Sequence, residues 1–242
     1  MIHYVFDVDG TLTEPRQKIK EEHKEEFINW AKDKKCFIST GSDFAKTKEQ
    51  IGQEVLDVFQ SIYCCMGNET RKPTGEITRK HHFIIPKDLK TELNTLLNNS
   101  LFPYRTGNHF EERTGMLNFS VVGRNASTEQ RKEYFNWDNR VNERIKLANF
   151  VNNRYPTLEA SVGGSISIDI IQKGSDKGQV IHHLQGLGAK KIVFVGDKCL
   201  PGGNDYGIIR ELKKTTLAFE WYNVHGPKET IELITTNKVF GI

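Results

Sequence analysis

Residues Tyr4–Thr13 read YVFDVDGTLT, and they complete an apolar run that begins at Ile2. The run is typical of a buried β-strand, and Gly10 allows the chain to turn away directly after it. Asp7 and Asp9 are therefore expected at the C-terminal end of this strand. Ligands of open α/β sheets bind at that edge, so we expect the two acids to act on a ligand.

Two carboxylates one residue apart suit a hard cation such as Mg²⁺, which takes oxygen ligands and accepts substrate phosphate in its shell. Asp7 would then be a nucleophile toward phosphorus, and Asp9 would move the proton. A calcium loop of the EF-hand type is excluded, because Leu12 and Lys18 stand where it needs glycine and an acid. An ordinary β-turn capped by Asp and Gly remains the alternative for an isolated motif of this kind.

The composition indicates a globular protein with a substantial core. The chain has 242 residues, of which 37% are hydrophobic and 27% are charged, enough for one large or two modest domains. The net charge is only +3 and the lysines are spread out, so we expect neither a nucleic-acid partner nor a membrane partner. No apolar run reaches the roughly 18 residues of a membrane span, and the chain starts directly in a strand without a basic leader. These features predict a cytoplasmic protein, with its four cysteines reduced and without metal-ligand spacing.

Strands and helices are expected to alternate at both ends of the chain, which favours a parallel sheet with helices on both faces. The expected strands are 2–6, 36–38, 62–66, 192–195 and 216–219. The expected helices are 17–35, 44–59, 179–187 and 230–235. Turn residues at 67–75 also predict a small hairpin.

The pattern changes between residues 82 and 172. A helix over 86–98, alternating strands within 110–122, a long polar helix over 128–152 and a strand over 165–171 are expected there. This stretch is large enough to form a domain of its own. We therefore predict an α/β core from 1–81 and 173–242, and an inserted α+β cap domain from 82–172 that lies as a lid over the carboxylate edge.

Polar groups recur where the predicted core strands end. They are the hydroxyls of Thr40–Ser42, Lys177 at a helix start, and the acids Asp197 and Asp205 in a glycine-rich turn. Phosphoryl transfer needs a nucleophile, a metal, a fixed cation and hydroxyl or amide donors, and this set contains them. Taken alone, the hydroxyls are explained by helix capping and the lysine by a solvated helix position.

Together these motifs resemble, in order, the four motifs of the haloacid dehalogenase (HAD) superfamily of phosphotransferases. The insert is also similar to eukaryotic-type phosphomannomutases, through Glu112–Arg124, Gly163–Asp169 and Pro201–Asp205. The resemblance implies a HAD-like Rossmannoid core with a parallel sheet and an α+β cap. It also implies a hexose phosphomutase that interconverts mannose 6-phosphate and mannose 1-phosphate through an aspartyl-phosphate.

The resemblance also implies a role for individual residues. Asp7 would be the nucleophile, Asp9 the general acid/base, and Lys177 the catalytic cation. Mg²⁺ would be held by Asp7, by the main-chain carbonyl of Asp9 and by Asp197. Implied as well are a hexose 1,6-bisphosphate activator, a homodimer formed through the cap, and a place in mannose metabolism and GDP-mannose biosynthesis. The implied substrate-binding residues are Arg16, Thr40, Ser42, Arg113, Arg124, Arg131, Ser167 and Asp169.

Some positions depart from the family pattern. Thr40 stands where the mutases usually have glycine and many superfamily phosphatases have threonine, and Ser175 replaces a tryptophan. Thr106 replaces a basic residue and Val121 a proline, while residues 210–214 lack the acidic stretch of a second, structural cation site. A Mg²⁺-dependent sugar-phosphate phosphatase is therefore the alternative, followed by a non-catalytic sugar-phosphate-binding protein. An ATP-dependent kinase is disfavoured by the lack of a phosphate-binding Gly-x-x-x-x-Gly-Lys-Ser/Thr loop.

Overall fold

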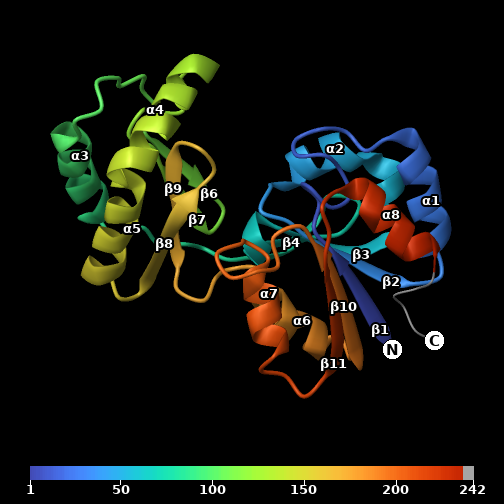
Figure 1. Ribbon diagram of the computed structural model, residues 1–242. Coiled ribbons are helices and arrows are strands. Elements are labelled where there is room, and N and C mark those ends of the chain that lie inside the picture. The colour runs from blue at the N-terminus through green and yellow to red at the C-terminus, as the bar shows by residue number, and fades with distance from the viewer. Residues whose placement is uncertain (237–242) are drawn as a thin grey trace. The chain divides into compact units, whose positions relative to one another are not determined.

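The computed structural model describes residues 1–236, which divide into two compact units (Figure 1). The core unit contains Met1–His81 and the chain from Ser175 onward, and the cap unit contains His82–Gly174. Within the described residues, no helix has both the length and the apolar character needed to cross a membrane.

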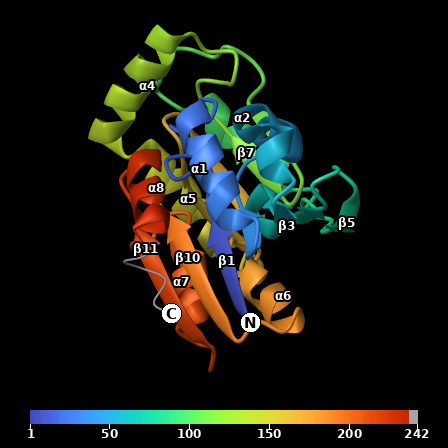
Figure 2. The same cartoon turned by 90° about the vertical axis from the view of Figure 1, so that its right-hand side faces the viewer.

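The core unit is built on a seven-stranded sheet with the order β11-β10-β1-β2-β3-β4-β5. Five neighbouring strands are parallel, and β3, β4 and β5 pair antiparallel as an edge hairpin. Figure 2 shows β11, β10 and β1 side by side. The strands are β1 (Ile2–Phe6), β2 (Lys35–Ser39), β3 (Phe59–Cys64), β4 (Glu69–Arg71), β5 (Ile77–Lys80), β10 (Lys191–Gly196) and β11 (Ala218–Asn223).

Helices cover both faces of this sheet, because successive side chains of a strand point to opposite sides. Tyr4 and Phe6 of β1 pack in the cluster that contains residues of α1, α2 and α8, whereas Val5 packs with residues of α6 and α7. The core helices are α1 (Glu21–Ala31), α2 (Phe44–Leu56), η1 (Cys65–Gly67), α6 (Gln179–Gly186), α7 (Tyr206–Leu212) and α8 (Pro227–Thr235). The predicted α/β class with a parallel sheet is thus confirmed.

Strand register decides which residues meet at the carboxyl edge of the sheet. Phe6 is paired with Ile38 of β2 on one side and with Val195 of β10 on the other. The residues that follow these three positions therefore leave the sheet at the same edge. That edge carries Asp7, Thr40 and Asp197.

The cap unit has a four-stranded antiparallel sheet with the order β6-β7-β9-β8. Leu117, Phe119, Ile168 and Ile170 pack with apolar residues of the three cap helices on one face of this sheet. Its strands are β6 (Phe110–Arg113), β7 (Met116–Phe119), β8 (Leu158–Gly163) and β9 (Ser167–Gln172), and its helices are α3 (Leu89–Asn99), α4 (Thr128–Val141) and α5 (Glu143–Arg154).

The cap differs from the prediction in two respects, one wrong helix and one missed strand. The single helix over 128–152 is two helices, because Asn142 adopts a left-handed conformation with φ 55° and ψ 39°. Asp138 then accepts a hydrogen bond from the main-chain N–H of Arg144 at 2.8 Å, which stabilises the start of α5. Strand β8 was not predicted, although the alternation of Leu158, Ala160 and Val162 is a strand signal.

Candidate active site

Asp7 follows β1 directly and is buried, with 3% of its surface exposed. Its main-chain N–H donates to the carbonyl of Val195 at 3.0 Å, which continues the pairing of β1 with β10. Its carboxylate Oδ1 accepts a hydrogen bond from Lys177 Nζ at 2.6 Å. The predicted nucleophile is therefore held at the sheet edge by both its backbone and its side chain.

Lys177 is fully buried, so the alternative of a solvated helix lysine is wrong. Its ammonium lies between two carboxylates, 2.6 Å from Asp7 Oδ1 and 2.6 Å from Asp205 Oδ1. Burial lowers the pKa of Lys177, but Asp205 and Asp7 outweigh it and raise that pKa above its usual value. The side chain is a fixed cation at the reactive carboxylate.

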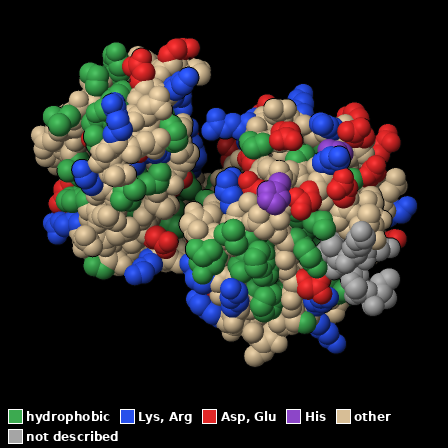
Figure 3. Space-filling model, in the orientation of Figure 1, with side chains coloured by type: hydrophobic (Ala, Val, Ile, Leu, Met, Phe, Trp, Pro, Cys, Tyr) green, Lys and Arg blue, Asp and Glu red, His purple; other side chains and the backbone are tan. Residues whose placement is uncertain are grey.

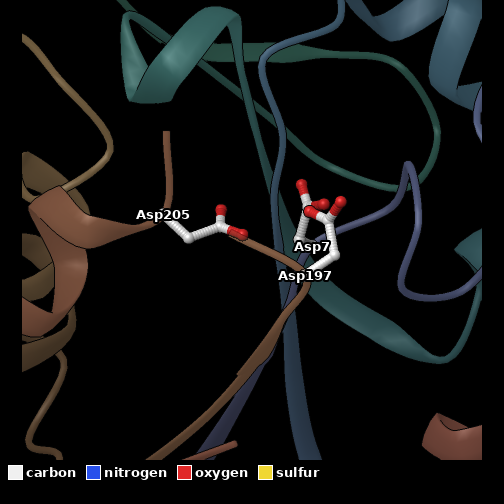
Figure 4. Close-up of side chains that lie close together, drawn as sticks. All are labelled: Asp7, Asp197 and Asp205. Carbon is white, nitrogen blue, oxygen red and sulfur yellow. The ribbon is translucent and has the colours of Figure 1, made fainter. Parts of the chain in front are cut away.

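Asp197 follows β10 and meets Asp7 and Asp205, with carboxylate oxygens of all three within 4.8 Å of one another. Figure 4 shows the Asp205 side chain directed toward the other two. Gly10 permits this approach, because a Cβ atom there would lie 2.5 Å from Asp197 Oδ2, and its φ is +80°. Asp205 was noted in the sequence as an acid in the same glycine-rich turn as Asp197, but it was not included among the predicted site residues.

The electrostatics of this group favour a divalent cation. Burial raises the pKa of Asp7 to about 7, although the Lys177 ammonium opposes the rise. Asp197 Oδ2 lies 3.0 Å from Lys198 Nζ, while its buried Oδ1 has no hydrogen-bond partner among the described residues. Converging carboxylate oxygens, one of them without a donor, fit a hard cation such as Mg²⁺.

Asp9 lies at the same turn, but its side chain is held by other partners. Its Oδ1 accepts from the main-chain N–H of Arg16 at 2.6 Å and from Gln50 Nε2 at 2.8 Å. Ser42 Oγ lies 3.5 Å from Asp9 Oδ2. The Asp9 carboxylate is therefore held by partners outside the group of three acids that could hold a metal.

Gln50 of α2 was missed by the sequence interpretation. Its side chain is buried, and its main-chain carbonyl accepts from the main-chain N–H of Ile19 at 2.8 Å. This bond is available because α2 is interrupted at Gly52, whose φ is 76°. The one sequence signal for this position is Gly52, a glycine inside the expected helix and two residues after Gln50.

The hydroxyl turn lies just past β2, as predicted. Thr40 is buried, and its main-chain N–H donates to the carbonyl of Tyr63 at 2.9 Å. Its Oγ1 accepts from the N–H of Ser42 at 3.1 Å. The cap of α2 is Asp43, which accepts from the N–H of Lys46 at 2.8 Å, so helix capping does not account for the hydroxyls.

The polar face of the cap sheet carries a row of polar and charged side chains. The register pairs Glu111 with Asn118 and Asn118 with Asp169 across three strands. Asn118 Nδ2 donates to Asp169 Oδ1 at 2.6 Å and to Ser167 Oγ at 3.0 Å. Burial raises the pKa of Asp169, opposed by the Asn118 hydrogen bond and by the charges of Arg113 and Arg124. Glu111 and Asn118 were not in the predicted site.

The three predicted cap arginines divide into two kinds. Arg113 and Arg124 both contact the Glu111 carboxylate, through Arg113 Nε and Nη2 at 2.9 and 2.8 Å and Arg124 Nε at 2.9 Å. Arg131 donates to the main-chain carbonyls of Ala126 and Arg124, at 2.9 and 2.5 Å. Arg131 therefore supports the loop that carries Arg124, and direct contact between Arg131 and a substrate stays a prediction.

The sequence matches the family described as eukaryotic phosphomannomutase over residues 23–240. It is 34% identical to the phosphomannomutase of Saccharomyces cerevisiae over 96% of this chain and 92% of the yeast protein. The chain belongs to the eukaryotic phosphomannomutase family. Among other members of the family, phosphomannomutase 2 of Dictyostelium discoideum is 31% identical, with 95% of this chain and 94% of that protein covered.

Solved structures place this phosphomannomutase-family chain in the HAD fold. The C-terminal domain of Candida albicans trehalose-6-phosphate phosphatase aligns with a TM-score of 0.65 at 14% identity, over 97% of this chain and 91% of that one. A haloacid dehalogenase-like hydrolase from Bacteroides thetaiotaomicron aligns with a TM-score of 0.61 at 14% identity, over 97% and 98%. At such identities the likeness concerns the fold alone.

Proposed function

We propose that this protein is a hexose phosphomutase that interconverts mannose 6-phosphate and mannose 1-phosphate. The observation that carries the proposal is the buried Asp7 carboxylate, held by Lys177 beside Asp197, in a member of the eukaryotic phosphomannomutase family. A buried carboxylate paired with a fixed cation is the arrangement that a phosphorylated aspartate intermediate requires.

The chain's own groups perform the proton transfer and receive the phosphoryl group. Asp7 takes a phosphoryl group from a hexose 1,6-bisphosphate, and Asp9 gives a proton to the departing sugar oxygen. In the reverse sense, Asp9 removes a proton from a hydroxyl of the bound monophosphate, which then accepts the phosphoryl group from Asp7. Lys177 balances negative charge on Asp7 throughout, because it stays protonated between Asp7 and Asp205.

Mg²⁺ is the cofactor in this proposal. The carboxylates of Asp7 and Asp197 and the main-chain carbonyl of Asp9 would hold it, and Asp205 would orient Lys177 beside it. Bound there, the ion neutralises phosphate charge.

The proposal assigns substrate-binding residues to each unit separately. In the core, the hydroxyls of Thr40 and Ser42 bind the reacting phosphate, and Arg16, whose main-chain N–H bonds to Asp9, adds a cation. The cap supplies guanidinium groups for the other phosphate, and guanidinium forms paired hydrogen bonds to phosphate oxygens. Ser167 and Asp169 bind sugar hydroxyls. Arg113 and Arg124 are the cap arginines assigned to the phosphate itself.

A sugar-phosphate phosphatase is the second candidate, favoured by the threonine at position 40. The purified protein is incubated with mannose 1-phosphate, Mg²⁺ and a trace of hexose 1,6-bisphosphate, and the products are quantified. Mannose 6-phosphate as the main product is expected, whereas inorganic phosphate as the main product would establish hydrolysis instead.

The same assay tests the nucleophile. Asp7→Asn is expected to lower interconversion by at least about 10³-fold, because an amide cannot form the acyl phosphate. Asp43→Asn changes an exposed capping acid and serves as the matched control, for which near wild-type turnover is expected. Wild-type rates for Asp7→Asn would refute the mechanism.

Location and assembly are also part of the proposal. All four cysteines are free and buried thiols, which suits a cytoplasmic protein.

Ile84 and Leu101 of the cap unit are 84% and 88% exposed, and large apolar side chains of this kind suit a homodimer through the cap. The proposal includes no nucleic-acid partner. On the face shown in Figure 3, Lys and Arg side chains are scattered among acidic ones. Light scattering of the purified protein tests the dimer.

A further inference from the structure

The Glu111 carboxylate occupies the binding edges of two cap arginines. Arg113 donates to both of its oxygens, at 2.9 and 2.8 Å, in the side-on manner in which guanidinium groups hold phosphate. Arg124 Nε lies 2.9 Å from Glu111 Oε2. The resident carboxylate thus uses the Nε and Nη2 donors of Arg113 and the Nε donor of Arg124, for which a phosphate would compete.

The charge balance of this cluster limits its attraction for anions. Hydrogen bonds from Arg113 are the main cause that holds the pKa of Glu111 below its usual value, and the charges of Arg113 and Arg124 add to it. Glu111 is therefore ionised near neutral pH and cancels one of the two guanidinium charges. Its side chain is 34% exposed, so it can move aside without unpacking the cap core.

We propose that Glu111 acts as a competing anion that sets how tightly Arg113 and Arg124 hold a substrate phosphate. When a phosphate arrives, the carboxylate is displaced from the guanidinium edges, and it returns when the phosphate leaves. The pair of arginines stays oriented in both states.

A mutase has a reason to limit this affinity, and here the inference rests on the proposed function. The bisphosphate has to be released from the cap groups and turned around before the second phosphoryl transfer. Binding energy that is equally strong before and during the reaction lowers KM without raising kcat, and it slows release. A carboxylate that competes for the arginines shortens the time for which each phosphate is held.

Glu111→Gln tests the inference, because it keeps the length and an acceptor oxygen but removes the charge. The KM for mannose 1-phosphate and the inhibition constant of inorganic phosphate are both expected to fall by about three- to tenfold, the scale of one partly exposed charge pair. We expect kcat to fall as well, because release becomes slower. Glu111→Asp restores the charge and is expected to bring both constants back toward wild type.

Glu112→Gln is the matched control. Glu112 is the next residue of β6, and its ion pair is with Lys90 of α3, on the opposite side of the strand. For Glu112→Gln, the KM for mannose 1-phosphate and the inhibition constant of inorganic phosphate are expected to stay within about twofold of wild type. An unchanged or higher KM and inhibition constant for Glu111→Gln, compared with Glu112→Gln, would overturn the inference.

Direct binding separates this inference from the proposed function. Inorganic phosphate is titrated calorimetrically into the full-length wild-type protein and the Glu111→Gln variant, with no divalent metal added. Tighter binding by the variant supports the role of Glu111 even if neither protein interconverts hexose phosphates, and equal or weaker binding contradicts it even if both do.

Discussion

Gln50 takes no part in the proposed reaction, but its side chain orients the carboxylate of Asp9. Its Nε2 donates to Asp9 Oδ1 at 2.8 Å and lies 3.3 Å from Thr13 Oγ1. With the N–H of Arg16 on the same oxygen, these donors leave Asp9 Oδ2 as the oxygen suited to carry the proton. Gln50 is thus a positioning residue for the proposed general acid/base.

Gln50→Leu is expected to lower turnover of hexose phosphates by about ten- to a hundredfold, within the usual contribution of a general acid. Phosphorylation of Asp7 by an aryl phosphate should change much less, because that leaving group needs no proton. The two rates are compared by product assay and by phosphoprotein formation. Gln53→Leu, in the same helix, is the control, since Gln53 bonds to Asp57 and to the carbonyl of Pro73. Equal losses with both substrates would contradict the positioning role.

The elements of the cap show how local chemistry can divide a predicted helix. The polar sequence over 128–152 has helical character throughout, yet α4 ends at Val141 and α5 begins at Glu143. Asn142 tolerates the left-handed conformation between them, because its short polar side chain can bond locally. The buried pair of Asp138 and Arg144, 2.7 Å apart, links the two helices across this turn.

Substitutions at Asn142 should follow from its backbone conformation. Asn142→Gly is expected to leave the free energy of unfolding within about 0.5 kcal/mol, whereas Asn142→Val should lower it by about 1–2 kcal/mol, because a β-branched residue is strained at positive φ. Urea unfolding measures both values. Asn139→Val, at an exposed helical position of α4, is expected to cost less than Asn142→Val, and equal costs would show that the kink is not strained.

At the scale of the whole molecule, the active-site groups come from distant parts of the chain. Lys177 and Asp7 are 170 positions apart, and the cap unit lies between them in the sequence. They meet because Asp7 leaves the carboxyl end of β1 while Lys177 stands just before α6, a helix whose Val180, Ile181 and Leu184 pack in one cluster with Val5 of β1. The same close packing buries the thiols of the core.

Buried thiols predict a loss of stability at high pH. Burial raises the pKa of Cys36 to about 12, with the charge of Lys34 opposing it, whereas an unfolded thiol ionises near pH 8.5. Between these values the unfolded chain binds fewer protons than the folded chain, so the free energy of unfolding falls as pH rises. The slope from this group reaches about 1.4 kcal/mol per pH unit.

Urea unfolding at pH 8 and pH 10 measures this loss. Cys36→Ala should be less stable at pH 8 because of the lost packing, but its stability should fall less between the two pH values. A fall equal to or steeper than that of wild type would contradict the assignment to Cys36.

Much of the fold could be predicted from the sequence, because its signals are local. Each of these signals depends on residues close together in the chain. They are the apolar run that ends in Asp7 and Asp9, the alternation of strands and helices, and the change in the pattern of expected elements after residue 81. Strand β8 was missed despite such a signal. The fold class was confirmed, and the hydroxyl turn lies where the end of β2 predicted it.

Only the tertiary structure decided how those groups are used. The burial of Lys177, its second bond to Asp205, and the partners of Asp9 and Glu111 depend on side chains brought together from different elements. Sequence periodicity indicates which face of an element is apolar, but it does not specify which polar groups meet across a sheet edge. That choice depends on strand register and on the cost of leaving a buried charge without a partner.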